Sequence, residues 1–375
     1  MVYRALGLMS GSSLDGLDLA FVHLHENAGK WDFEIIKADC YPYDDEWKKR
    51  LRSATELSAL DYHLLHSEYG HHLGLQINRF IAENNFQFQV QIIASHGHTT
   101  FHVPEKKMTA QLGDGAAIAA ATGINVVSDL RAMDVALGGE GAPIVPIGEK
   151  LLWKDFDFFL NIGGIANISF KDEENFIAFD ICSANAILNM LANKMGKEFD
   201  EEGWHASQGN INEELLKKLN DLDYYGDAYP KSLANKFGQE IVYPMIRDAR
   251  LSIEDALRTY VEHIVIQIKN AAEKLIANNT QFNNEDSKLK TKNRKLLSTG
   301  GGTLNLFLIE RLRNHLSDLN IKVIIPDENI IKYKEAVIMA LIGTLRWREE
   351  NNVLSSVTGA SRSSIGGAVW IGQEA

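Results

Sequence analysis

Residues Gly7 to Asp18 have the sequence GLMSGSSLDGLD, and the rest of the chain is organised around this stretch. Tyr3–Leu6 predicts a short strand before it, and Leu17–Leu24 alternates apolar with polar or small residues, as a half-buried second strand does. Glycine and serine in the intervening turn allow backbone N–H groups to surround phosphate oxygens. Asp15 and Asp18 would repel a bare phosphate, so they predict a hydrated Mg²⁺ between themselves and the phosphate. The alternative is an ordinary Gly/Ser hairpin, since the spacing matches neither a P-loop nor a Rossmann motif.

The length and composition predict a soluble globular protein of two domains. The chain has 375 residues, 45% of them hydrophobic and 23% charged, and it exceeds the length at which one hydrophobic core usually stops growing. Its net charge of −12 argues against nucleic acid and anionic membranes as partners, because both attract basic surfaces. Cys40 and Cys182 are too few for a disulfide framework and fit a reducing cytosol. No signal peptide or membrane-length apolar run is evident, so a cytoplasmic location is expected.

The opening hairpin is predicted to recur in the second half of the chain. Residues 156–161 form a strand pattern, 162–167 a glycine turn with Gly163 and Gly164, and 168–170 a return strand. The glycine-rich segment GGEGAPIVP, residues 138–146, is interpreted as the linker between the halves. The expected division is therefore a first domain of residues 1–137 plus 350–375 and a second domain of residues 138–349. Ile365–Ile371 is expected to pack back on the first domain.

Polar residues follow several predicted strands, at the edge where α/β proteins bind ligands. Val90–Ser95 is predicted to be a strand that ends in the turn His96–Thr100. Asn175–Phe179 is predicted to be a strand that delivers Asp180 to its end, and Ser183 is expected to cap the next helix.

A second glycine turn, Gly300–Gly302, follows the predicted strand Lys295–Ser298. Its backbone would let a flat ring such as adenine lie close, and a tight strand-to-helix turn is the alternative. Leu57–Asn84 predicts one long helix, or two with a break near Gly70. A zinc site is disfavoured both for the four histidines of this helix and for the group at 96, 98 and 102, because neither comes with cysteines or clustered carboxylates.

Seven motifs occur in order along the chain, from Gly7 to about Ala360. They are GLMSGSSLDGLD, SHGHTTFHVP, QLGDG, TGINVVSDLRAMD, GGEGAPIVP, NIGGIANIS and SVTGA. Together they resemble the motifs of the anhydro-N-acetylmuramic acid kinase family, within the superfamily of sugar kinases, Hsp70 and actin. The resemblance implies an α/β fold of two actin-like (ribonuclease H-like) domains with a nucleotide cleft between them.

The resemblance also implies a reaction and the residues that perform it. Water opens the 1,6-anhydro ring of 1,6-anhydro-N-acetylmuramic acid while O6 takes the γ-phosphate of ATP, giving N-acetylmuramic acid 6-phosphate and ADP in cell-wall recycling. Asp180 matches the family's catalytic aspartate and is expected to take the proton of water. Mg²⁺ is expected to be held through water near Asp15 and Asp18, without direct protein ligands, and a homodimer is left open. The expected nucleotide-binding residues are Gly11, Ser12, Ser13, Leu14, Asp15, Gly16, Leu17, Asp18, Gly163, Gly164, Gly300 and Gly301, and the expected sugar-binding residues are His96, Thr99, Arg131 and Asn185.

Two departures from the family pattern leave alternatives open. The family usually continues its catalytic aspartate with TGPGN, whereas Asp180 is followed by ICSAN, so both glycines are missing. Glu140 stands where glutamine is usual. A non-catalytic ATP-dependent sugar sensor and a kinase for another sugar are therefore kept as alternatives. For Arg131, the alternative to a substrate carboxylate is an ion pair with Asp129 or Asp134.

Overall fold

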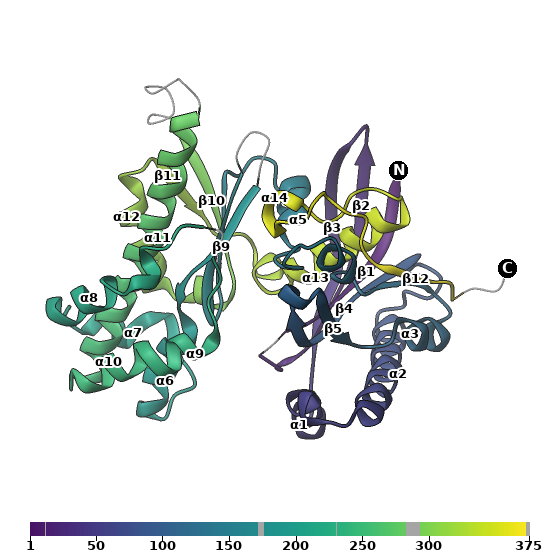
Figure 1. Ribbon diagram of the computed structural model, residues 1–375, viewed down its shortest axis with the longest axis horizontal. Helices are drawn as coiled ribbons and strands as arrows, with labels where there is room; N and C mark the ends of the chain where they lie inside the picture. Colours follow the sequence, from purple (N-terminus) through teal and green to yellow (C-terminus); the bar gives the residue numbers. More distant parts are fainter. Residues whose placement is uncertain (12, 172–175, 230, 283–292, 373–375) are drawn as a thin grey trace. The chain divides into compact units, whose positions relative to one another are not determined.

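The computed structural model describes residues 1–11, 13–171, 176–229, 231–282 and 293–372. Ser12 and Asn175, which the sequence analysis used, lie outside the described residues. The chain divides into two compact units (Figure 1), unit 1 with Met1–Lys154 and Tyr333–Ala375 and unit 2 with Asp155–Lys332.

These boundaries differ from the expected ones because the residues after Gly138 pack within unit 1. The ammonium of Lys334 donates to Glu149 Oε1 at 2.8 Å, and both side chains are buried. A Cβ on Gly148 would lie 2.4 Å from the side chain of Ile338, so this stretch fits closely against the C-terminal part of the unit. Residues 138–154 and 333–349 therefore belong with unit 1, and the glycine-rich segment lies inside it.

The sheet of unit 1 has the strand order β12-β6-β4-β1-β2-β3, with β5 paired to β4. β1 is antiparallel to β2 and parallel to β4, β2 is antiparallel to β3, and β4 is parallel to β6. β12 pairs antiparallel with β6, which confirms that the C-terminal segment packs on this unit. The strands are β1 (Val2–Ser10), β2 (Gly16–Asn27), β3 (Lys30–Pro42), β4 (Ile92–Val103), β5 (Met108–Leu112), β6 (Asn125–Ser128) and β12 (Ala368–Trp370).

Helices cover both faces of this sheet because successive residues of β1 point to opposite sides. Leu6 and Leu8 join one buried cluster with residues of α2, while Gly7 on the other face lies against the backbone of α13. α2 is one continuous helix through Gly70, which confirms the first of the two predictions for this segment. The helices of unit 1 are α1 (Asp45–Arg52), α2 (Ala59–Glu83), α3 (Gly115–Thr122), α4 (Ala132–Ala136), α5 (Pro146–Leu152), α13 (Glu328–Trp347) and α14 (Ser355–Thr358).

Strand β4 corrects the prediction that a turn begins at His96. β4 continues through the histidines to Val103 because β5 pairs with it from His98 onward. Gly97 takes a φ of +70°, and a Cβ there would lie 2.4 Å from the carbonyl oxygen of Leu112. The glycine therefore allows the close approach of β5 instead of ending the strand.

Unit 2 repeats the topology of unit 1. Its sheet has the order β11-β10-β7-β8-β9, in which β7 is antiparallel to β8, β8 is antiparallel to β9, β7 is parallel to β10, and β10 is parallel to β11. The same pattern of directions holds for β6-β4-β1-β2-β3 of unit 1. The prediction of an α/β fold with two similar halves is therefore confirmed. The strands are β7 (Phe158–Ile162), β8 (Ile165–Lys171), β9 (Phe176–Ser183), β10 (Arg294–Thr299) and β11 (Ile321–Ile324).

Strand β9 corrects two further predictions. Asp180 lies inside β9 and not at its end, because pairing with β8 continues to Ser183 across a bulge. Ser183 therefore belongs to the strand, and α6 begins after Ala184 without a side-chain cap. The helices of unit 2 are α6 (Asn185–Ala192), α7 (Trp204–Gln208), α8 (Glu213–Asn220), α9 (Asn235–Phe237), α10 (Tyr243–Asp248), α11 (Ile253–Phe282) and α12 (Leu306–Ser317).

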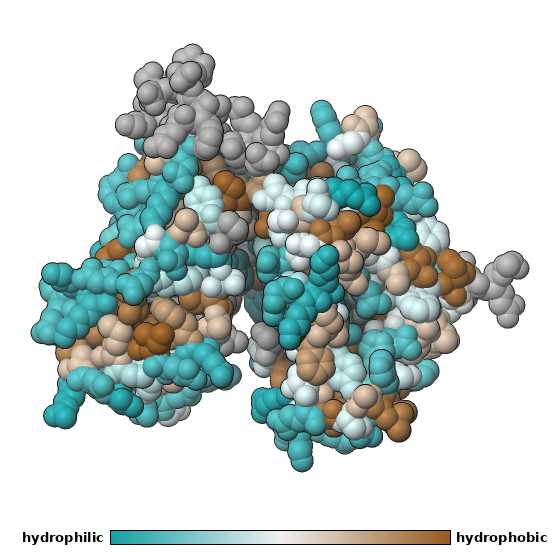
Figure 2. Space-filling view, viewed as in Figure 1, coloured by the Kyte–Doolittle hydropathy of each residue, from teal (hydrophilic) through white to brown (hydrophobic). Residues whose placement is uncertain are grey.

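The surface is mostly polar on the face drawn in Figure 2, where hydrophilic residues cover much of both units and hydrophobic ones form small separate groups. Within the part of the chain that the structure describes, no helix combines the length and apolar character needed to cross a membrane.

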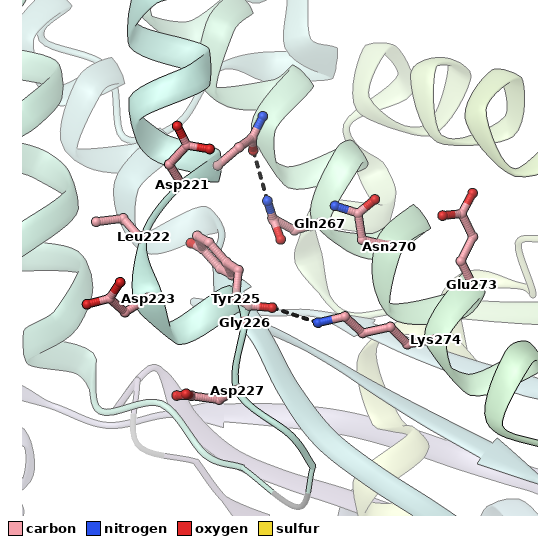
Figure 3. Close-up of a pocket in the computed structure, with 11 residues that line it drawn as sticks. Asp221, Leu222, Asp223, Tyr225, Gly226, Asp227, Gln267, Asn270, Glu273 and Lys274 are labelled. Carbon is pink, nitrogen blue, oxygen red and sulfur yellow. Dashed lines mark hydrogen bonds between the residues drawn. The ribbon is translucent and has the colours of Figure 1, made fainter.

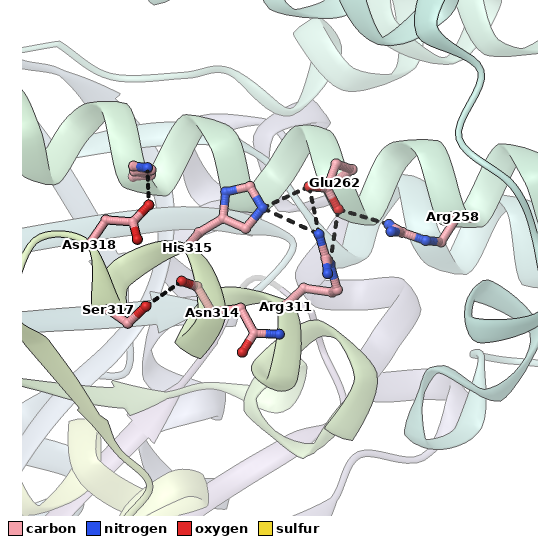
Figure 4. Close-up of polar contacts among 8 residues, drawn as sticks. Arg258, Glu262, Arg311, Asn314, His315, Ser317 and Asp318 are labelled. Carbon is pink, nitrogen blue, oxygen red and sulfur yellow. Dashed lines mark hydrogen bonds and ion pairs between the residues drawn. The ribbon is translucent and has the colours of Figure 1, made fainter.

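A charge network joins α11 to α12 inside unit 2 (Figure 4). Glu262 accepts from Arg258 at 2.8 Å and from both ends of the Arg311 fork at 3.1 Å, and its Oε1 lies 2.8 Å from His315 Nε2. Burial alone would raise the pKa of Glu262, but the hydrogen bonds and charges of Arg311 and Arg258 outweigh it and lower that pKa to about 2.

We expect Glu262→Gln to lower the free energy of unfolding by about 3 kcal/mol at pH 7, because it leaves the partly buried Arg258 and Arg311 without their anion. Since the folded pKa lies below the ordinary value of 4.5, the contribution of Glu262 is complete above about pH 4.5 and is lost as the pH falls towards 2. Urea unfolding at pH 7 and pH 3 measures both effects. As a control, Glu214→Gln breaks an exposed pair with Lys218 and should leave the free energy of unfolding almost unchanged. Equal losses in the two variants would contradict the prediction.

Candidate active site

The turn between β1 and β2 presents a glycine-rich backbone at the edge of the unit 1 sheet. Leu14 donates from its N–H to the carbonyl of Gly11 at 3.3 Å and takes a left-handed φ of 59°, so the chain reverses tightly. A Cβ on Gly11 would meet only Ser13 Oγ at 3.7 Å, which leaves the backbone open on that side. Gly16 is required for a different reason, since a Cβ there would lie 2.6 Å from the carbonyl oxygen of Tyr41 on β3.

Acidic side chains gather behind this turn. Burial is the main reason that the pKa of Asp18 rises to about 6, and the charges of Glu335 and Asp15 raise it further, while a hydrogen bond with the Cys40 thiol opposes the rise. Leu17, next to Asp18 on β2, is buried in the core of the unit. Glu335 comes from α13, and its charge also raises the pKa of Arg131. The same carboxylate therefore affects a predicted nucleotide-binding residue, Asp18, and a predicted sugar-binding residue, Arg131.

Arg131 and His96, both predicted to bind the sugar, contact each other. Arg131 Nε donates to His96 Nε2 at 2.9 Å, and its Nη1 donates to the carbonyl of Gly141 at 2.6 Å. Burial and the Arg131 charge lower the pKa of His96 to about 3, so the imidazole is neutral, with Nδ1 2.9 Å from the carbonyl of Gly97. Burial lowers the pKa of Arg131 to about 10.

The Asp134 carboxylate has hydrogen-bond partners other than Arg131. It accepts from Thr358 at 2.7 Å and from the N–H of Gly141 at 2.8 Å. The Arg131 guanidinium donates to His96 and Gly141. Thr99 lies on β4 with an exposed side chain.

In unit 2, Asn185 lies among the four predicted glycines. Its N–H donates to the carbonyl of Gly163 at 3.0 Å, and its side-chain amide donates to the carbonyl of Ile162 at 3.1 Å. A Cβ on Gly301 would lie 3.7 Å from the Asn185 amide nitrogen, so the second glycine turn borders the same side chain. Gly164 accepts from Ala184 at 2.7 Å, and Gly300 takes a φ of +81°.

Asp180 is half-buried on β9, two positions before Cys182. Its Oδ2 accepts from the N–H of Leu233 at 2.9 Å, and its main-chain carbonyl accepts from Tyr224 Oη at 2.7 Å. Its own N–H donates to the carbonyl of Lys231 at 3.2 Å. Burial raises the pKa of Asp180, and the hydrogen bond from Leu233 opposes that rise.

Sequence reasoning did not predict the residues that surround the predicted acids. Tyr224, Lys231 and Leu233 lie about 50 positions from Asp180 in the sequence and belong to no recognised motif. Glu335 belongs to none of the seven motifs, whereas the cross-strand pair of Cys40 with Asp18 could have been found from the hairpin register.

A pocket of about 690 Å³ lies elsewhere in unit 2 (Figure 3). It is lined mainly by carboxylates and amides of the segment after α8 and of α11, and none of the predicted site residues that the structure describes lines it.

Comparison with known proteins identifies the family. The family model described as "Anhydro-N-acetylmuramic acid kinase" matches residues 3–372. Proteins named anhydro-N-acetylmuramic acid kinase from Haemophilus influenzae and Sulfurimonas denitrificans are 31% and 30% identical to this chain, each over 97% of it and over 97% and 98% of their own lengths. The protein of that name from Aliivibrio fischeri is 32% identical over 98% of this chain and 99% of its own. The chain therefore belongs to the anhydro-N-acetylmuramic acid kinase family.

Proposed function

We propose that this protein uses ATP to open 1,6-anhydro-N-acetylmuramic acid with water and to phosphorylate O6, giving N-acetylmuramic acid 6-phosphate and ADP. In this reaction water bonds to C1 and the C1–O6 bond breaks. O6 then takes the γ-phosphoryl group as the bond to ADP breaks, and the proton of water goes to a base. The product would serve cell-wall recycling and amino-sugar catabolism. Membership of the family supports the reaction as a whole.

The observation that carries the proposal is the carboxylate of Asp180. It is half-buried, its pKa is raised by burial, and one of its oxygens is held by the N–H of Leu233. A general base needs a pKa closer to the working pH than that of a free carboxyl and a fixed direction towards the proton it takes. Asp180 has both properties, so we assign it as the base that activates water.

The glycine turns suit a nucleotide. Phosphoryl transfer depends mainly on positioning and on neutralising charge, and open backbone N–H groups provide both. We assign this role to residues Gly11 and Ser13–Asp18 of unit 1, and we propose that Gly163, Gly164, Gly300 and Gly301 of unit 2 also bind nucleotide; Ser12 lies outside the described residues.

The carboxylates behind the first turn suit a hydrated cation. Asp15 and Asp18 are oxygen donors of the kind that Mg²⁺ prefers, and the charges of Asp15 and Glu335 raise the pKa of Asp18, so a cation would relieve their repulsion. Mg²⁺ would be held through water near Asp15 and Asp18, and when bound it would neutralise phosphate charge.

Turnover tests the proposal directly. The protein, Mg-ATP and 1,6-anhydro-N-acetylmuramic acid should yield ADP and a 6-phosphosugar in equal amounts by mass spectrometry, and ADP should not form without the sugar. Folded protein that yields no product would defeat the proposal. Binding of both ligands in calorimetry without turnover would instead support the sugar-sensor alternative, which is motivated by the altered segment after Asp180. A panel of other sugars tests the remaining alternative.

We expect Arg131→Lys to raise KM for the sugar by about tenfold or more and to leave KM for ATP unchanged. The guanidinium is proposed to bind the lactyl carboxylate, and a lysine cannot reproduce its planar pair of donors. Steady-state kinetics with 1,6-anhydro-N-acetylglucosamine, which lacks the lactyl group, provides the control. The wild-type protein should prefer the lactyl sugar, and the variant should lose that preference. An unchanged preference would contradict the assignment.

A further inference from the structure

Three residues of one loop hold Asp180 from the same side, and we call Tyr224, Lys231 and Leu233 the Asp180 clamp. The Tyr224 hydroxyl donates to the main-chain carbonyl of Asp180. The N–H of Asp180 donates to the carbonyl of Lys231, and the N–H of Leu233 donates to the Asp180 carboxylate. We propose that the clamp selects the reacting atom, occupying Oδ2 so that Oδ1 takes the proton from water. This inference rests on the proposed function, in which Asp180 is the base.

The clamp is tied together by the side chain of Lys231. Its ammonium donates to the carbonyl of Tyr224 at 2.7 Å and lies 4.2 Å from the centre of the Tyr224 ring. The positive charge over the ring face adds a cation–π attraction to the hydrogen bond. Tyr224 therefore has little freedom to rotate, and its hydroxyl stays directed at the main chain of Asp180.

A second lysine anchors the residue next to Tyr224. Lys274 reaches from α11 and donates to the carbonyl of Tyr225 at 2.8 Å (Figure 3). Tyr225 Oη lies 3.0 Å from His263 Nε2, also on α11, and both side chains are buried. The clamp thus rests on a long, packed helix, so the position of Asp180 is set by residues outside its own strand.

The contacts give the two carboxylate oxygens of Asp180 different roles. A base works best when a free lone pair points at the proton it takes. A carboxylate that can rotate could direct any of its four lone pairs at that proton. The N–H of Leu233 removes that freedom by engaging Oδ2. Of the titratable groups around Asp180, Tyr224 lies on the loop and Cys182 on β9, and burial raises the pKa of both, so they stay neutral at physiological pH. The charge of Asp227 acts on the pKa of both Lys231 and Tyr224 and raises each of them.

The test compares Leu233→Pro, which deletes the N–H, with Leu233→Ala, which keeps it and removes most of the side chain. A hydrogen bond to a charged group corresponds to about one to two pKa units, so the acid limb of the kcat–pH profile should move up by about one pH unit in Leu233→Pro only. Carbon-13 NMR titration of Asp180 in the ligand-free protein, assigned with Asp180→Asn, should give the same shift. This second readout needs no turnover, so it stays informative if the proposed function fails.

Tyr224→Phe keeps the aromatic ring that Lys231 contacts and removes only the hydroxyl. It therefore tests the clamp even if Leu233→Pro does not fold. We expect kcat to fall about tenfold with KM for both substrates unchanged, since the base is displaced but binding is not. The clamp is overturned if Leu233→Pro and Leu233→Ala have the same acid limb and the same Asp180 titration, or if Tyr224→Phe keeps the kcat of the wild-type protein. An inactive wild-type protein with the expected NMR shift would overturn the proposed function alone.

Discussion

Replacing Asp180 with asparagine is expected to lower kcat for the anhydro sugar by about 10³-fold or more. Asparagine cannot take a proton from water, and general base catalysis typically contributes factors of about 10² to 10⁴. Its side-chain oxygen can still accept the N–H of Leu233, which bonds Asp180 Oδ2 at 2.9 Å in the wild-type protein. The fold and nucleotide binding should therefore survive, and ADP formation measured beside a calorimetric ATP titration separates the two effects.

The matched control is Asp221→Asn, which makes the same chemical change at the end of α8 in the same unit. It should leave kcat and KM at wild-type values, because Asp221 is exposed and belongs to no predicted site. Similar rates in Asp180→Asn and Asp221→Asn would rule out Asp180 as the base.

The pH profile gives a further check on the same residue. Burial raises the pKa of Asp180 above its ordinary value of 3.8, and the base must be ionised to act. The rate should therefore fall as the pH drops through that raised pKa, and this acid limb should be absent from the residual rate of Asp180→Asn.

The sequence predicted the topology of both units because each begins with a strand, a Gly turn and a return strand. Local patterns of this kind are visible in a single sequence, and the matching strand orders around β1 and β7 confirm them. The end of a strand is different, because it depends on a partner far away in the chain. β4 passes His96 because β5 pairs with it, and β9 passes Asp180 because β8 pairs with it as far as Ser183.

The candidate site shows the same limit at the level of side chains. Residue types identified Arg131 and His96 separately, but only the structure shows that one donates to the other at 2.9 Å. Asp180 was found through its motif, whereas the Tyr224 hydroxyl donates to the main-chain carbonyl of Asp180 and Leu233 donates to its carboxylate from a main-chain N–H. Such backbone groups leave no mark on residue identity. Contacts that use the backbone of one partner are therefore the part of the site that a single sequence does not reveal.

Gly7→Ala is expected to destabilise unit 1 strongly, lowering its free energy of unfolding by about 3 kcal/mol and Tm by roughly 10 °C. A Cβ at this position would lie 1.9 Å from the carbonyl oxygen of Ala336 and 2.7 Å from the N atom of Ala340. Both atoms belong to the backbone of α13, so no side chain can rotate away, and the helix must move off the sheet.

Gly11→Ala is the matched control, since it makes the same change in the same motif where the nearest atom to a new Cβ is Ser13 Oγ at 3.7 Å. It should change Tm by no more than a degree or two, because the added methyl group makes only ordinary contacts. Thermal and urea unfolding of the two variants measure the difference, and equal transitions would show that α13 does not press against β1. The comparison also separates two uses of glycine in one stretch: Gly7 is small so that α13, which carries Glu335, can lie close to the sheet, whereas Gly11 leaves its backbone open where phosphate is proposed to bind.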